Sequence, residues 1–150
     1  MIGEIIMLFK EINNENLNEA VKIFKDSFNA APWFEKWTEE TASKRLGQII
    51  NFEGGYGLIA HDGENNLAII VGHEEYYYDG TRFNIKEFCV NDNFKGQGIG
   101  TKVLEEFVSR LKERGIVQMS LYTLREEKTL KFYVKNGFKE IENLVMMENV

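Results

Sequence analysis

The most constraining feature of the chain is a glycine-rich segment, Lys95 to Thr101, which reads Lys-Gly-Gln-Gly-Ile-Gly-Thr. It lies between an apolar run typical of a strand and a long amphipathic run typical of a helix. Glycine has no Cβ, so the amides of such a loop can turn inward and approach an anion closely. The following helix adds its unpaired first-turn amides and the positive end of its dipole. The segment therefore predicts a strand–loop–helix unit that binds phosphate.

The length and composition are those of one soluble domain. The 150 residues are 43% hydrophobic and 28% charged, with a single proline. A chain of this length can bury roughly 70% of its unfolded surface, so we expect a single domain over residues 1–150. The formal charge of −6 argues against nucleic-acid binding, which depends on Lys and Arg. It favours a cationic small molecule as partner.

The cysteine and histidine content excludes several classes of site. A single cysteine, Cys89, cannot form an internal disulfide, and His61 and His73 are too few for an ordinary zinc site. We expect Cys89 to be a small buried apolar residue, both histidines to be structural, and no metal. The apolar run Met1–Phe9 contains Glu4 and is too short to cross a bilayer, so we expect an edge strand there. A cytoplasmic protein without a membrane segment is expected.

Four segments have the apolar spacing of amphipathic helices. Thr38 is placed to cap the second of them, and Gly115 to end the third. The four segments are Leu17–Phe28, with Asn14 or Asn16 as cap, Thr38–Ile50, Ile99–Leu111, and about Glu126–Lys135, which Asn136-Gly137 ends.

Five further segments are predicted strands in addition to the first. Three of them form an antiparallel meander through Asp-Gly turns, and the fourth returns parallel to the third through the long helix. These strands are Tyr56–His61, Leu67–Tyr78, Arg82–Val90, Ile116–Thr123 and Phe138–Met147. The fold class is therefore α/β with a mixed central sheet, in the order strand, two helices, three strands, helix, strand, helix, strand.

Two common nucleotide-binding patterns do not fit the glycine loop. A Walker loop needs Gly, four residues and Gly-Lys-Ser/Thr, whereas Gly96 is followed five positions later by Thr101. A dinucleotide loop needs Gly-x-Gly-x-x-Gly and an acid at the end of the next strand, which here ends Tyr122-Thr123.

The loop instead resembles the pyrophosphate loop of the GNAT N-acetyltransferases, Gln/Arg-x-x-Gly-x-Gly/Ala, at Lys95–Gly100. Glu87-Phe88-Cys89-Val90 resembles the Glu-x-x-Val of the family's fourth strand. Lys131–Phe138 resembles its Phe-Tyr-x-x-x-Gly-Phe signature. The resemblance spans most of the chain and is strongest from Ile85 to Phe138. It implies the GNAT fold and an acetyl-CoA-dependent N-acetyltransferase that acts on a small-molecule amine.

The resemblance also implies roles for individual residues. Glu87 would be the base that deprotonates the amine, and Tyr133 the acid that protonates the leaving thiolate. The acetyl-CoA-binding residues that it implies are Phe88, Cys89, Val90, Lys95, Gly96, Gln97, Gly98, Ile99, Gly100 and Thr101.

Two positions depart from the family pattern. Lys95 replaces Gln or Arg and lacks the two-pronged hydrogen bonding of arginine. Glu126 stands where many relatives carry asparagine at the start of the last helix. An acid there can cap helix amides, but it would repel a nearby phosphate.

The residues themselves leave several alternatives open. Strict alternation puts Glu87 on the buried face with Ile85 and Cys89, as a site residue rather than a solvated one. A bulge near Phe88 or Cys89, which the family has, would redirect these side chains. Tyr133 packs as core, acts as the acid, or does both.

The acceptor side of the site is equally open. Trp33 and Trp37 form a hydrophobic staple or wall an acceptor pocket. Glu75 and Tyr77 lie in an exposed hairpin end or in an acidic, aromatic lining that attracts an amine cation. A non-catalytic acyl-CoA-binding or sensor domain is the alternative function, and a homodimer through an exposed strand is possible.

Overall fold

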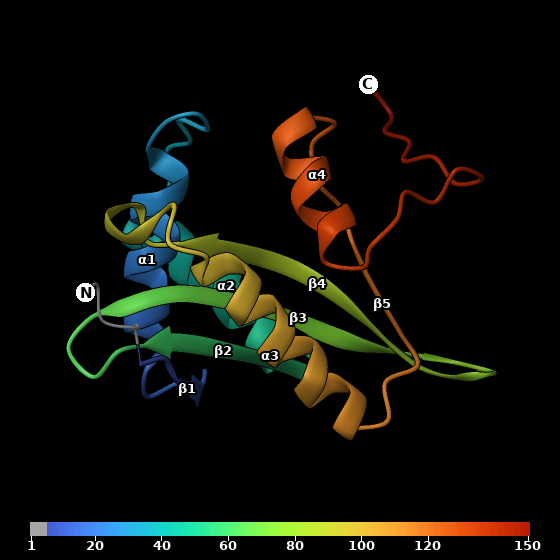
Figure 1. The fold of residues 1–150 in the computed structure, drawn as a ribbon, viewed down its shortest axis with the longest axis horizontal. Helices are drawn as coiled ribbons and strands as arrows, with labels where there is room; N and C mark the ends of the chain where they lie inside the picture. The colour runs from blue at the N-terminus through green and yellow to red at the C-terminus, as the bar shows by residue number, and fades with distance from the viewer. Residues whose placement is uncertain (1–5) are drawn as a thin grey trace.

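The computed structural model describes residues 6–150, in which helices cover both faces of a central sheet (Figure 1). A short 3₁₀ turn at Asp92–Phe94 precedes the glycine loop. The elements are β1 (Leu8–Glu11), α1 (Leu17–Asn29), α2 (Glu39–Asn51), β2 (Gly55–His61), β3 (Asn66–Tyr77), β4 (Gly80–Val90), α3 (Ile99–Glu113), β5 (Gln118–Leu121) and α4 (Glu127–Lys135).

The sheet is mixed, with the strand order β1-β2-β3-β4-β5. β1 to β4 pair antiparallel, and β5 pairs parallel to β4 after the crossover through α3. The predicted α/β class, the meander and the parallel return strand are therefore confirmed. β1 is an edge strand, as predicted, but residues 1–5 of the expected segment lie outside the described residues. β5 is shorter than expected.

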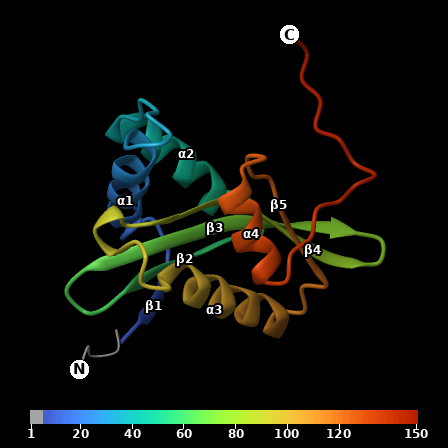
Figure 2. The same cartoon turned by 45° about the horizontal axis from the view of Figure 1, so that its top comes forward.

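Two apolar clusters bury the two faces of the sheet, and Figure 2 shows the helices that cover each face. α1 and α2 pack on one face through residues such as Phe24 and Leu46. α3 packs on the other face, where Phe107 lies between the rings of Tyr56 and Phe83 at centroid distances of 5.6 and 5.4 Å. The alternation of side chains along β2 and β3 supplies both clusters.

Local signals place the helix ends where the sequence predicts them. Thr38 accepts a hydrogen bond from the backbone N–H of Thr41, whose side chain bonds back in a capping box. Asn16 occupies the cap position of α1, although its side chain accepts from the backbone of Asn13 instead. Gly115, with φ of +85°, ends α3, because this left-handed conformation favours glycine.

The predicted bulge in β4 is present, but it lies two or three residues earlier. Val71 pairs with Glu87 and Gly72 with Ile85, so Lys86 is the extra residue. The bulge breaks the alternation that the sequence suggested. Glu87 therefore shares the α1–α2 face with Cys89, whereas Ile85 points to the α3 side. The prediction that all three share one face is wrong for this reason.

The predicted last strand, Phe138–Met147, is not formed. The chain after Gly137 has no regular secondary structure, and it runs away from the sheet in both Figures 1 and 2. An extended segment is stable as a strand only when its backbone groups pair with a neighbour. The segment pairs with no strand among residues 6–150, so it stays irregular. Within the same range, no helix is long and apolar enough to cross a membrane.

The packing of Phe107 generates a stability prediction. Phe107→Ala removes a fully buried ring from between two aromatic neighbours and should lower the free energy of unfolding by about 3–5 kcal/mol. Urea unfolding followed by circular dichroism measures this loss. Glu105→Ala, at an exposed position of α3, should stay within about 0.5 kcal/mol of the parent. Equal losses in the two variants would contradict this account of the core.

Candidate active site

The site begins where β4 and β5 separate. The two strands pair only from Arg82 with Gln118 to Ile85 with Leu121. β4 then continues through residues 86–90 without a paired strand on that side. Figure 1 shows β4 and β5 diverging. Backbone groups along this edge of β4 are available to a ligand that enters the opening. We call this opening the fork.

The glycine loop lies at the end of β4 and is open to solvent. Gly96 and Gly98 have φ of +80° and +76°, a conformation that L side chains rarely adopt. A Cβ built on either glycine would meet nothing within 4 Å. Gly98 is the cap residue of α3 and supplies no side-chain hydrogen bond to the helix, so the first-turn amides remain available to an anion. Buried Ile99 anchors the helix start beneath them.

The residues around this loop differ in how they face it. Lys95 forms an ion pair with Asp92, Nζ to Oδ1 at 2.8 Å, so part of its charge is already balanced. Gln97 is exposed, and Gly100 lies against the ring of Phe132, where an added Cβ would come within 3.4 Å. The loop and α4 are therefore in close contact.

Glu87 is the most buried acid near the fork, with only 17% of its side chain exposed. Arg45 of α2 donates from Nε to Oε2 of Glu87 at 3.1 Å. Burial raises the pKa of Glu87 above its usual value, and the opposing charge of Arg45 limits that rise. Glu35 raises the pKa of Glu87 slightly and Lys86 lowers it. Glu87 is therefore a buried carboxylate in an ion pair and not a solvated one.

Arg45 was not singled out from the sequence. It lies one residue before buried Leu46 and three after buried Ala42, at the border of the apolar stripe of α2. The sequence gives no means of identifying the acid that a cation in this position pairs with. The bulge at Lys86 turns Glu87 toward α2.

Tyr133 lies on the inner face of α4, half-buried among aromatic rings. Its ring contacts Phe132 and Phe138 at centroid distances of 5.1 and 5.8 Å, and it packs against the α3-side cluster. Burial raises the pKa of Tyr133 to about 12. Tyr133 is therefore part of the core, and its hydroxyl is protonated at neutral pH. A core position and a role as the acid are therefore compatible for Tyr133.

The three residues after Glu87 are split between the two faces of the sheet. Phe88 and Val90 pack toward α3, with the Phe88 ring 6.1 Å from that of Phe132. Cys89 is buried on the α1–α2 side, and burial raises the pKa of its thiol to about 12. Cys89 is thus the neutral apolar residue that the sequence predicts.

Trp33 and Trp37 lie near the end of α1, on the same side of the sheet as Glu87. The Trp33 ring is tilted against Phe28 and the Trp37 ring meets Phe24 edge-on, at centroid distances of 5.7 and 4.8 Å. The indole Nε1 of Trp37 donates to Oε1 of Glu35 at 2.7 Å. The two tryptophans therefore pack against aromatic side chains of α1, and Glu35 lies at the edge of this aromatic group.

Glu75 and Tyr77 do not join this group. They pair with Arg82 and Gly80 at the far end of the β3–β4 hairpin, where Arg82 lies 3.9 Å above the Tyr77 ring. Glu87 lies five positions after Arg82 in β4, roughly 16 Å along the strand. The structure therefore places these two residues in an exposed hairpin end.

Glu126 caps α4. The Thr129 hydroxyl donates to Oε2 of Glu126, and the backbone N–H groups of Thr129 and Lys128 donate to the same carboxylate at 3.0 and 3.2 Å. These bonds lower the pKa of Glu126. The helix capping that the sequence allows at this position is therefore formed.

A second polar pair, missed from the sequence, lies at the base of the fork. Asn84 is 6% exposed, and its Nδ2 donates to Oγ of Ser120 at 3.4 Å across β4 and β5. Oδ1 of Asn84 is buried and has no hydrogen-bond partner among the described residues. An unpaired buried acceptor of this kind is costly.

The resemblance found in the sequence implies a GNAT fold. The fork, the glycine loop and buried Glu87 agree with that fold. The family model for the acetyltransferase (GNAT) domain matches residues 47–140. The chain belongs to the GNAT acetyltransferase family. This match includes the fork, the glycine loop, Glu87 and all of α4.

Individual relatives of this GNAT chain are distant. It is 24% identical over 151 aligned positions to a thialysine N-epsilon-acetyltransferase of Mus musculus, a match that covers 93% of this chain and 79% of that protein. Its fold is similar to that of a possible acetyltransferase from Clostridium difficile 630, with a TM-score of 0.81, 15% identity, and 96% and 97% coverage of the two chains. The fold is also similar to that of an aminoglycoside N-acetyltransferase solved in complex with CoA. The TM-score is 0.74 and the identity 15%, with 96% of this chain and 95% of that chain covered.

GNAT enzymes use acetyl-CoA, and the residues of this chain fit that molecule. The open space around Gly96 and Gly98 leaves room for a diphosphate against the backbone, where side chains would block it. Within residues 6–150, no three His, Cys, Asp or Glu side chains gather as a metal site.

The Arg45–Glu87 pair generates a pH-dependent prediction. Arg45→Gln removes the charge that opposes burial, so the pKa of Glu87 should rise further above 4.5. A raised folded-state pKa means that stability is retained below the unfolded-state pKa and lost as pH rises through the folded one. The variant should therefore lose about 1–3 kcal/mol at pH 7 and clearly less near pH 4. Urea unfolding at the two pH values measures the difference.

The double variant Arg45→Gln/Glu87→Gln is the matched control, because it has no carboxyl to titrate at this position. Its stability loss should no longer depend on pH in this range. A loss in Arg45→Gln that is equal at both pH values would contradict the assignment of Arg45 as the charge that stabilises ionised Glu87.

Proposed function

We propose that this chain is an N-acetyltransferase that moves the acetyl group of acetyl-CoA to a primary amine of a small, cationic acceptor by direct attack in a ternary complex. The observation that carries the proposal is the fork, which has the glycine loop at one end and Glu87 on the α1–α2 face. The single cysteine, buried and reduced, supports a cytoplasmic setting.

The cofactor side of the proposal uses the backbone more than side chains. The amides of Gly96, Gln97, Gly98, Ile99, Gly100 and Thr101 would hold the diphosphate, helped by the dipole of α3. Lys95 would add positive charge, reduced by its pairing with Asp92. The unpaired edge of β4 at Phe88, Cys89 and Val90 would hydrogen-bond the arm that reaches into the fork.

Glu87 would accept the proton that the acceptor amine loses. An alkylamine has a pKa near 10 and is mostly protonated at neutral pH, so it must be deprotonated before it attacks. The raised pKa of Glu87 makes it a better base than an exposed glutamate. Arg45 bonds Oε2, and in the described part of the chain no hydrogen bond to Oε1 is formed, so Oε1 is the oxygen that would receive the proton directly or through water.

Bound acetyl-CoA supplies an activated acyl group. A β4 amide near Phe88–Val90 would stabilise the negative charge that develops on the carbonyl oxygen as the amine attacks. Tyr133 would donate its hydroxyl proton to the thiolate that leaves. With a pKa of about 12, this hydroxyl keeps its proton across the neutral range and is a ready donor.

The acceptor is proposed from charge and from relatives. The net charge of −6 and the acids Glu35 and Glu87 near the fork favour a cation. The names of the relatives, thialysine and aminoglycoside acetyltransferases, denote small amines. Trp33 and Trp37 would wall the acceptor side, and Glu75 and Tyr77 would take part only if a long acceptor reaches the hairpin end.

The experiment that tests the function follows CoA thiol release from acetyl-CoA with a panel of polyamines, aminoglycosides, amino acids and peptides. We expect amine-dependent release with at least one member and thermal stabilisation by CoA. Stabilisation by CoA without turnover on any amine would favour the acyl-CoA sensor instead. Stabilisation by ATP or NAD but not by CoA would contradict both.

The glycine loop gives a binding prediction with a matched control. Gly98→Ala adds a methyl group where φ is +76° and nothing lies within 4 Å, so it strains the backbone and crowds the anion. The dissociation constant of CoA should rise on the order of tenfold or more, as measured by calorimetry. Gly63→Ala adds the same group at φ of +99°, also in open space but in the β2–β3 turn. It should leave CoA affinity unchanged, and equal losses would contradict the loop assignment.

Tyr133→Phe tests the acid. Phenylalanine keeps the ring contacts with Phe132 and Phe138, so folding and the KM for acetyl-CoA should be nearly unchanged. The kcat should fall on the order of 100-fold. Tyr122→Phe, which removes a hydroxyl from an exposed ring, is the control and should keep full turnover. Unchanged kcat in Tyr133→Phe would remove this residue from the acid role.

A further inference from the structure

Arg45 uses only part of its hydrogen-bonding capacity on Glu87. A guanidinium carries N–H donors on Nε and on both terminal nitrogens, in a planar fork. The Nε of Arg45 donates to Oε2 of Glu87 at 3.1 Å. Among the described residues, Arg45 forms no other hydrogen bond or ion pair. The donors on its two terminal nitrogens therefore remain available to a ligand.

These terminal nitrogens are held in place and are open to solvent. The neighbouring Leu46 is buried and fixes this turn of α2, and the contact with Glu87 fixes one edge of the guanidinium. The Arg45 side chain is 35% exposed, and neither terminal nitrogen is buried. An arginine held in this way loses little further freedom on binding, and carboxylate is an anion that matches its fork.

Two acids accompany this arginine beside the fork. Glu87 lies against it, and the negative charge of Glu35 contributes to the raised pKa of Glu87. The indole Nε1 of Trp37 donates to Glu35 at 2.7 Å and fixes its position. Two acids and one arginine complement a molecule with two ammonium groups and one carboxylate. A polyamine would bring positive charge against Arg45, which is unfavourable.

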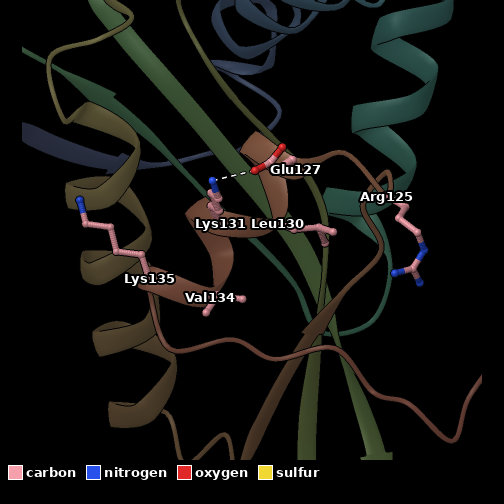
Figure 3. A pocket seen from close by; sticks show the side chains of 6 residues that line it. All are labelled: Arg125, Glu127, Leu130, Lys131, Val134 and Lys135. Atoms are coloured by element: carbon pink, nitrogen blue, oxygen red, sulfur yellow. Dashed lines mark ion pairs between the residues drawn. The ribbon is translucent and has the colours of Figure 1, made fainter.

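The cations on the outer face of α4 do not offer this combination. Figure 3 shows Arg125, Lys131 and Lys135 around a depression of about 600 Å³. Lys131 pairs with Glu127, and Arg125 pairs with Glu140. Both of these acids are exposed, so no buried carboxylate accompanies the cations there.

We propose that the terminal nitrogens of Arg45 bind a carboxylate of the acceptor while Glu87 takes the proton from its amine, so that the acceptor is a basic amino acid. This inference rests on the proposed acetyl transfer at the fork and narrows its acceptor. Glu35 holds the second ammonium group. Arg45 is then a residue that determines specificity, in addition to the charge that it sets against Glu87.

The test compares lysine with lysinamide as acceptors, because the two differ only in a carboxylate against a neutral carboxamide. The kcat/KM for each is measured from CoA thiol release. The parent should prefer lysine on the order of tenfold or more, and Arg45→Gln should lower this ratio by a similar factor. Any effect of Arg45 on Glu87 acts on both acceptors and cancels in the ratio. Arg45→Lys keeps the charge but not the fork and should give an intermediate ratio.

Lys44→Gln is the matched control, because it removes the same charge from the neighbouring, exposed position of α2. It should keep the parent ratio. A parent without a preference for lysine, or an Arg45→Gln variant with the parent ratio, would overturn the inference. Turnover of other amines in that case would leave the proposed function standing.

Binding to the CoA complex, measured by calorimetry, gives a readout that does not need turnover. Arg45→Gln should raise the dissociation constant of lysine on the order of tenfold and leave that of lysinamide nearly unchanged. Lysine binding that depends on Arg45, without turnover of any amine, would contradict the proposed function and support the carboxylate site. Lysine binding that does not depend on Arg45 would overturn the carboxylate site.

Discussion

The whole site depends on how briefly β4 and β5 pair. Four residue pairs join the two strands, after which β4 continues through residues 86–90 without a neighbour on that side. Backbone N–H and C=O groups left at such an edge need partners. Parallel strands that separate early therefore create a slot lined by main-chain groups, which an extended ligand can fill without any particular side chain.

In the proposed reaction the sheet would also separate the two reactants. The bulge at Lys86 turns Glu87 to the face that α1 and α2 cover, where Arg45 holds it. Phe88 and the start of α3 lie on the opposite side, against α4. A donor bound along the glycine loop and an acceptor bound near Glu87 would meet at the fork, and holding both in place lowers the barrier by removing the need for a chance encounter.

Local signals made most of the fold predictable, whereas long-range pairing did not. The cap at Thr38, the stop at Gly115 and the alternation in β2 and β3 act within a few residues, and the structure confirms each. The position of the bulge depends on the register with β3, which no local pattern encodes. The segment Phe138–Met147 has the composition of a strand, but it pairs with no other strand in residues 6–150.

The same distinction applies to the site. The glycine loop follows from a short motif. The face that Glu87 occupies depends on the bulge, and its partner is Arg45, 42 residues away. The acidic aromatic hairpin end with Glu75 and Tyr77 shows the limit of composition, since the register with Arg82 and Gly80 places it apart from the fork.

The central claim is that main-chain amides at the start of α3 hold the diphosphate of CoA and direct its acyl end into the fork. A crystal structure with CoA bound tests it most directly. The account predicts phosphate oxygens within hydrogen-bond distance of the amides from Gly98 to Thr101 and the pantetheine arm beside Phe88–Val90. A ligand bound elsewhere, or amides turned away from it, would contradict the account.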